Sequence, residues 1–194
     1  LGWLIVSSSY GSPLPLAKST SGKNVSWTIE RLKIAKPIVL NPVHTYTGGY
    51  ITIVASNVDT TRLVHLEQTT VYRNAGKYTQ TYTLRNTSLE WEDGTQTPVV
   101  IEVEILKATV ARPAATSTYF VSDGSTKVLT FENYDETLMT LGGVYSAENV
   151  GTYTATFTLL DSNNYQFDGT TASTYEIHWE IGGQSIPIPT GSTY

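Results

Sequence analysis

The segment NAGKYTQTYTL spans Asn74–Leu84, and a similar segment, NVGTYTATFTL, spans Asn149–Leu159. The second segment begins 75 residues after the first. A glycine and a tyrosine hold equivalent places in the two copies, namely Gly76 and Tyr78 in one and Gly151 and Tyr153 in the other. The match indicates an internal repeat, and each copy of a repeat is expected to form the same structural unit.

Three junctions set the frame of the repeat. IAKP at Ile34, VARP at Val110 and IPIP at Ile186 follow one another at intervals of 76 residues. We therefore expect four segments: the C-terminal strands of an incomplete unit in residues 1–33, full units in 34–109 and 110–185, and the start of a further unit or a tail in 186–194. The sequence is expected to be part of a longer array.

The repeated segment has the alternation of a β-strand. Tyr78 and Tyr82 fall on one face, and the threonines between them fall on the other. The closing strand of each unit alternates in the same way, and its core position is predicted to be Trp27, Val103 and Trp179 in turn. Asp-Gly-Thr turns at Asp93 and Asp168 separate the last strands. With no sustained helical period, short strands and turns predict an all-β, antiparallel fold.

The motif N-x-G-x-Y-T resembles the immunoglobulin (Ig) signature in which a tyrosine begins the sixth strand at the tyrosine corner. Gln80 and Ala155 stand where that signature has its second cysteine. Together with the Asp-Gly-Thr turn, the W-x-I ending and the K/R-P junction, the motif is similar to bacterial Ig-like tandem repeats of surface and phage virion proteins. The resemblance implies tandem Ig-like antiparallel β-sandwiches and an extracellular place on a virion or bacterial cell. The structural signature comprises Tyr78, Tyr153, Gly76, Gly151, Trp27 and Trp179.

The composition argues against several partners. The 194-residue chain has a net charge of −5 at pH 7, whereas nucleic acids and anionic membranes bind clustered lysine and arginine. The chain has no cysteine, which excludes disulfides and thiolate metal sites. Its apolar run WLIV is much shorter than the roughly 20 residues of a membrane-spanning helix. We expect neither nucleic-acid binding nor membrane insertion.

No catalytic or cofactor-binding constellation is expected. The three histidines, His44, His65 and His178, are not at the spacing of metal ligands. Oxygen-bearing side chains alternate in Asp161–Gly169, as in a calcium loop, but flanking helices and a terminal glutamate are missing. Aspartate and asparagine also favour turns for local reasons. We therefore expect no catalytic residue, no metal ligand and no cofactor.

The sequence leaves three classes of function. The first is a non-catalytic spacer or decoration with weak adhesion, whose partners are neighbouring Ig-like units of a longer chain and other virion or surface proteins. The second is an adhesin module that binds a host-surface glycan or receptor, for which the aromatic rings of Trp91 and Tyr165 are the candidate contacts. An enzyme is a distant third. The fold class alone does not choose among them.

Overall fold

The computed structural model describes the backbone of residues 3–4, 17–18 and 28–186 and the side chains of residues 28–186. Trp27 of the predicted signature lies outside the described residues, as do residues 187–194. The chain divides into two compact units, Leu1–Leu32 and Lys33–Tyr194. In the first unit the described backbone forms one antiparallel pair, β1 (Trp3–Leu4) with β2 (Ala17–Lys18).

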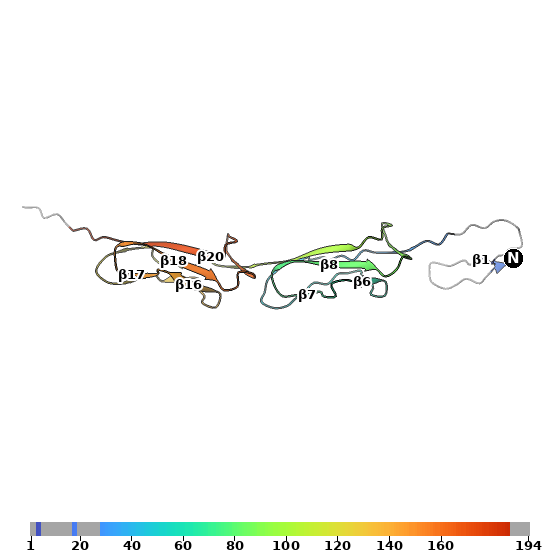
Figure 1. Cartoon of the computed structure of the whole chain (residues 1–194), viewed down its shortest axis with the longest axis horizontal. Coiled ribbons are helices and arrows are strands. Elements are labelled where there is room, and N and C mark those ends of the chain that lie inside the picture. The colour runs from blue at the N-terminus through green and yellow to red at the C-terminus, as the bar shows by residue number, and fades with distance from the viewer. Residues whose placement is uncertain (1–2, 5–16, 19–27, 187–194) are drawn as a thin grey trace, which may run out of the picture. The chain divides into compact units, whose positions relative to one another are not determined.

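Every regular element in the described residues is a β-strand, which confirms the all-β prediction. Beyond the first pair, the strands form two groups (Figure 1), which we call the first lobe (residues 33–107) and the second lobe (108–186). The strands of the first lobe are β3 (Leu32–Ile34), which begins one residue before the lobe, β4 (Val43–Thr45), β5 (Ile51–Thr52), β6 (Leu63–His65), β7 (Val71–Tyr72), β8 (Gly76–Leu84), β9 (Leu89–Trp91) and β10 (Val99–Leu106).

The second lobe contains ten strands within residues 108–186. They are β11 (Ala108–Val110), β12 (Ala114–Ala115), β13 (Tyr119–Val121), β14 (Lys127–Val128), β15 (Phe131–Glu132), β16 (Met139–Gly143), β17 (Ser146–Ala147), β18 (Gly151–Leu159), β19 (Tyr165–Phe167) and β20 (Thr174–Gly182). Strand β11 pairs with β19, so we count Ala108 as the first residue of the second lobe. The predicted domain limits themselves stay predictions.

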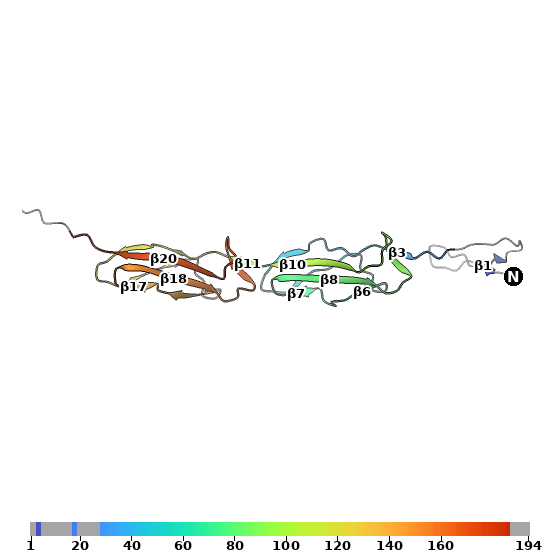
Figure 2. The ribbon, with the colours of Figure 1, turned by 45° about the horizontal axis from the view of Figure 1, so that its top comes forward.

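The main sheets of the two lobes have the same strand order. It is β4-β10-β8-β6 in the first lobe and β13-β20-β18-β16 in the second. Figure 2 shows β8 beside β10 and β18 beside β20, and both pairs are antiparallel. In both lobes the first strand of the sheet runs parallel to its neighbour. The repeated sequence segments, β8 and β18, therefore occupy the same place in their sheets.

Short strand pairs cover one face of each sheet. In the first lobe, Ile51 of β5 and Tyr72 of β7 pack with Val103 and Ile105 of β10. Val103 is buried, and so is Trp179 at the equivalent place in β20 of the second lobe. The alternation in the closing strands therefore correctly predicts which side chains face the core.

The strands β9 and β19 each place one large ring at the centre of their lobe. Trp91 and Phe167 are both completely buried. The indole N–H of Trp91 donates to the Thr97 carbonyl at 2.8 Å, which satisfies its one polar atom. The two rings are 76 residues apart, whereas the neighbouring Asp-Gly-Thr turns are 75 apart, so the sequence match hides their equivalence.

The basic residue of each K/R-P junction holds the Asp-Gly-Thr turn of its own lobe. Lys36 Nζ donates to the Asp93 carboxylate at 2.5 Å and holds the pKa of Asp93 down to about 2. In the second lobe, Arg112 Nε donates to the Asp168 carbonyl. Gly169 has a φ of +67°, where a side chain would be strained, and a Cβ there would approach the Arg112 guanidinium at 2.9 Å.

Both signature tyrosines make the hydrogen bond expected of a corner. The Tyr78 hydroxyl donates to the Asn74 carbonyl at 2.8 Å, and the Tyr153 hydroxyl donates to the Asn149 carbonyl at 2.7 Å. The rings of both tyrosines are half-buried. Each bond closes the loop that leads into the long repeated strand.

Tyr153→Phe is expected to lower the free energy of unfolding by about 1 kcal/mol, because it removes one intramolecular hydrogen bond and keeps the ring. Urea denaturation of the whole chain measures the change. Tyr145→Phe is the matched control, because no side-chain hydrogen bond is found for Tyr145 among residues 28–186. Equal effects of the two substitutions would contradict a stabilising role for the corner bond.

Candidate functional site

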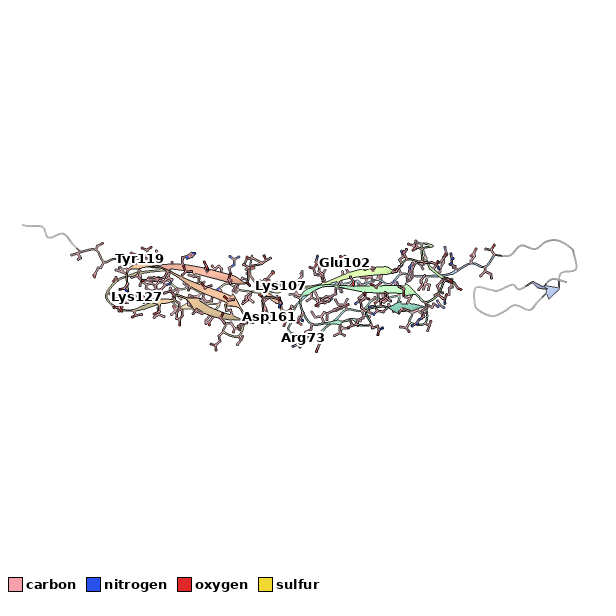
Figure 3. The ribbon with its side chains drawn as sticks, viewed as in Figure 1. Arg73, Glu102, Lys107, Tyr119, Lys127 and Asp161 are labelled. Atoms are coloured by element: carbon pink, nitrogen blue, oxygen red, sulfur yellow. The ribbon has the colours of Figure 1, made fainter. Side chains whose placement is uncertain are left out.

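Polar contacts between segments distant in sequence lie where the two lobes meet. We call this region the joint: the corner Asn74–Gly76 of the first lobe and the turn Asp161–Asn164 of the second. The corner leads into β8, and the turn connects β18 to β19. Figure 3 shows Lys107 and Asp161 in this region. The joint therefore brings the start of one long strand to the loop that follows the end of its counterpart.

The turn on the second lobe is shaped by its own polar residues. The backbone N–H groups of Asn164 and Tyr165 both donate to the Asp161 carbonyl, at 3.2 and 3.0 Å. Asp and Asn are common in such turns because their side chains also bond to the nearby backbone. The result is a tight turn that directs the Asn164 side chain into the joint, where the residue is only 7% exposed.

The Asn164 carboxamide bonds across the joint with both of its polar atoms. Its Oδ1 accepts from the Ala75 N–H at 2.7 Å, and its Nδ2 donates to Asn74 Oδ1 at 3.3 Å. Nδ2 also donates to Asp161 Oδ2 at 2.7 Å within the same turn. Because the joint supplies one donor and two acceptors, only an amide with the oxygen on the Ala75 side satisfies all three groups.

Further contacts tie the connecting segment to the same turn. Lys107 Nζ donates to the Ser162 carbonyl at 2.6 Å, and the Ala108 N–H donates to the Asn164 carbonyl at 2.9 Å. The rings of Tyr46 and Tyr165 meet edge to face, with centroids 5.3 Å apart. The joint thus combines side-chain, backbone and aromatic contacts from both lobes.

The two rings proposed from the sequence as glycan contacts are not free surface aromatics. Trp91 is completely buried in the first lobe, so it has no face open to a sugar. Tyr165 is half-buried, and the Tyr46 ring covers part of it at the joint. In this structure both rings contribute to packing, because the alternation of β9 and β19 turns Trp91 inward and the joint covers Tyr165.

Each of the three histidines contacts a different neighbouring residue, and within residues 28–186 none contacts another histidine. His44 Nε2 lies 3.1 Å from the Asn41 carbonyl oxygen, His65 stacks on Tyr82, and His178 Nδ1 lies 2.9 Å from Thr154 Oγ1. The described residues contain no group of three or more His, Asp or Glu side chains placed to hold a metal ion. Asp161, which the sequence places in a calcium-like segment, bonds to Asn164 in the joint.

An open groove of about 560 Å³ lies on the first lobe. Its lining includes Glu67, Lys77, Tyr78, Thr79 and Glu102. The Glu67 side chain also bonds to the backbone of β8, because its Oε2 accepts from the Thr81 N–H at 2.6 Å. Burial raises the pKa of Glu67, but hydrogen bonds from the Thr81 hydroxyl, the Thr81 N–H and the Glu67 N–H, together with the nearby His65, hold the pKa below its ordinary value. The groove therefore presents fixed negative charge beside one lysine.

No protein-family model matches the chain, and no curated protein matches it. Within the part of the chain that the structure describes, no helix is long and apolar enough to cross a membrane.

Asn164→Ala is expected to speed hydrogen exchange at the Ala75 amide by about tenfold or more, because the substitution removes its acceptor; tenfold corresponds to about 1.4 kcal/mol. Exchange measured by NMR on the whole chain gives the rate. Asn163→Ala is the matched control, because Asn163 is the exposed neighbour of the same residue type. Equal protection of the Ala75 amide in both variants would contradict a stabilising role for the hydrogen bond between Ala75 and Asn164.

Proposed function

We propose that the chain is a non-catalytic series of Ig-like β-sandwiches that acts as a spacer or decoration, with weak adhesion, on a phage virion or a bacterial cell surface. The observation that carries the proposal is the joint, in which the buried Asn164 amide bonds to the corner of the preceding lobe. A flexible linker would need no such matched donors and acceptors. A chain that holds a fixed spacing between its two ends does need them.

The shared strand order supports the Ig-like part of the proposal. Each lobe has a four-stranded sheet in which the long strand begins at a tyrosine bonded to the carbonyl four residues earlier, Tyr78 in one lobe and Tyr153 in the other. This bond is the hallmark of the tyrosine corner. The proposed partners are neighbouring Ig-like units and other surface or virion proteins.

Gold-labelled antibodies against the chain should bind intact phage particles or bacterial cells that produce it, without lysis. Strand β18 has nine residues and spans roughly 30 Å. Deleting residues 108–183 should therefore bring a C-terminal label about that much closer to the surface in electron micrographs. Labelling only after lysis would contradict the surface location, and an unchanged label distance would contradict the spacer role.

The groove on the first lobe favours a second candidate, a module that binds a host-surface glycan or receptor. The groove combines a tyrosine ring with hydroxyl, amine and carboxylate groups, which suits a hydroxyl-rich ligand. If it binds, a glycan array probed with the whole chain should give a selective signal that Lys77→Ala abolishes. Thr152→Ala, at the equivalent place in the second lobe, is the control. A signal that survives Lys77→Ala would rule out this groove.

A further inference from the structure

The second lobe carries a corner with the same design as the one in the joint. Asn149–Gly151 corresponds to Asn74–Gly76, and the Tyr153 hydroxyl bonds to Asn149 as Tyr78 bonds to Asn74. In the first lobe this corner is occupied by the Asn164 amide. The structure therefore shows, on one copy of the corner, what kind of group fits it.

The corner on the second lobe is open. Val150 is 59% exposed, and Asn149 is exposed as well. Among residues 28–186, no partner is found for the Val150 N–H or for the Asn149 carboxamide. These are the counterparts of the Ala75 N–H and the Asn74 carboxamide that receive Asn164 in the joint.

The last strand of each lobe, β10 or β20, also ends with the same hydrogen bond to the rest of its lobe. The Tyr46 N–H donates to the Leu106 carbonyl at the end of β10, and the Ser122 N–H donates to the Gly182 carbonyl at the end of β20, both at 2.9 Å. The glycine of each corner pairs with the residue just before that point, Ile105 or Ile181. A lobe following the second would thus meet its corner as the second lobe meets the first.

We propose that the Asn149–Val150 corner is a docking site for a turn of the Asp161–Asn164 kind, carried by another lobe that follows in tandem. The incoming asparagine accepts from the Val150 N–H and donates to Asn149 Oδ1. The proposal rests on the proposed function, in that it needs a series of like lobes. If the exchange tests below fail, the docking proposal is wrong, but the chain can still be a spacer whose second joint is flexible. If surface labelling fails, the proposed function is wrong, whatever the Asn149–Val150 corner binds.

Two differences make the second corner a weaker site than the first. Gly183 stands where Lys107 bonds to Ser162, and Ser122 stands where Tyr46 meets Tyr165. The second docking therefore depends chiefly on the asparagine amide. This dependence makes the proposal sensitive to one side chain.

The first test transfers two residues of the second lobe, Val150 and Gly183, to their equivalent places in the existing joint and keeps Tyr46. In the whole chain, Ala75→Val with Lys107→Gly reproduces the residues at Val150 and Gly183. The amide of residue 75 is expected to stay protected from exchange, and adding Asn164→Ala should speed its exchange by about tenfold. Exchange at residue 75 as fast as at the Val150 amide would overturn the proposal, because a valine corner would then not hold the amide.

The second test extends the chain by repeating residues 108–194 directly after Gly183. The Val150 amide is expected to exchange about tenfold more slowly than in the original chain. Asn164→Ala in the added copy should remove this protection, and Asn163→Ala in the added copy should leave it. Unchanged exchange at Val150, with the strand amides of the added lobe protected, would overturn the proposal. If the added lobe does not fold, the first test decides.

Discussion

The hydrogen bond from the Tyr78 hydroxyl to the Asn74 carbonyl links the interior of the first lobe to its joint. The ring of Tyr78 packs on Tyr72 with centroids 4.5 Å apart, so the hydroxyl is held by the core. The bond in turn fixes the loop that presents the Ala75 N–H to Asn164. A contact inside one lobe thereby sets the position of a contact between two lobes, and the same corner recurs at Tyr153.

The two lobes have the same strand order but different core residues at equivalent positions. In the first lobe Gln80 is completely buried, with its Nε2 donating to the Ile53 carbonyl at 2.9 Å and its Oε1 accepting from the Tyr82 hydroxyl at 3.0 Å. In the second lobe, Ala155 and Phe157 hold these places and pack without hydrogen bonds from their side chains. Both solutions work because buried polar groups cost little when each one is paired.

The alternation of apolar residues was sufficient to predict the long strands β8, β10, β18 and β20 and the burial of Val103 and Trp179, because side chains two residues apart in a strand lie on the same face. Trp91 was misplaced, since a one-residue shift between the copies hid its equivalence to Phe167. The joint could not be predicted: Asn74 and Asn164 lie far apart in the sequence, and asparagine in a turn already has a local explanation. Only the packing of one lobe on the other brings them together.

The central claim is that the joint holds the two lobes in one fixed orientation. Residual dipolar couplings of backbone N–H bonds, measured on the whole chain in a weakly aligning medium, test it most directly. The account predicts that a single alignment tensor fits residues 33–107 and 108–186 together, and that Asn164→Ala splits it into two. Two different tensors in the unmodified chain would contradict the account, because the lobes would then reorient freely despite the contacts between Asn164 and the corner.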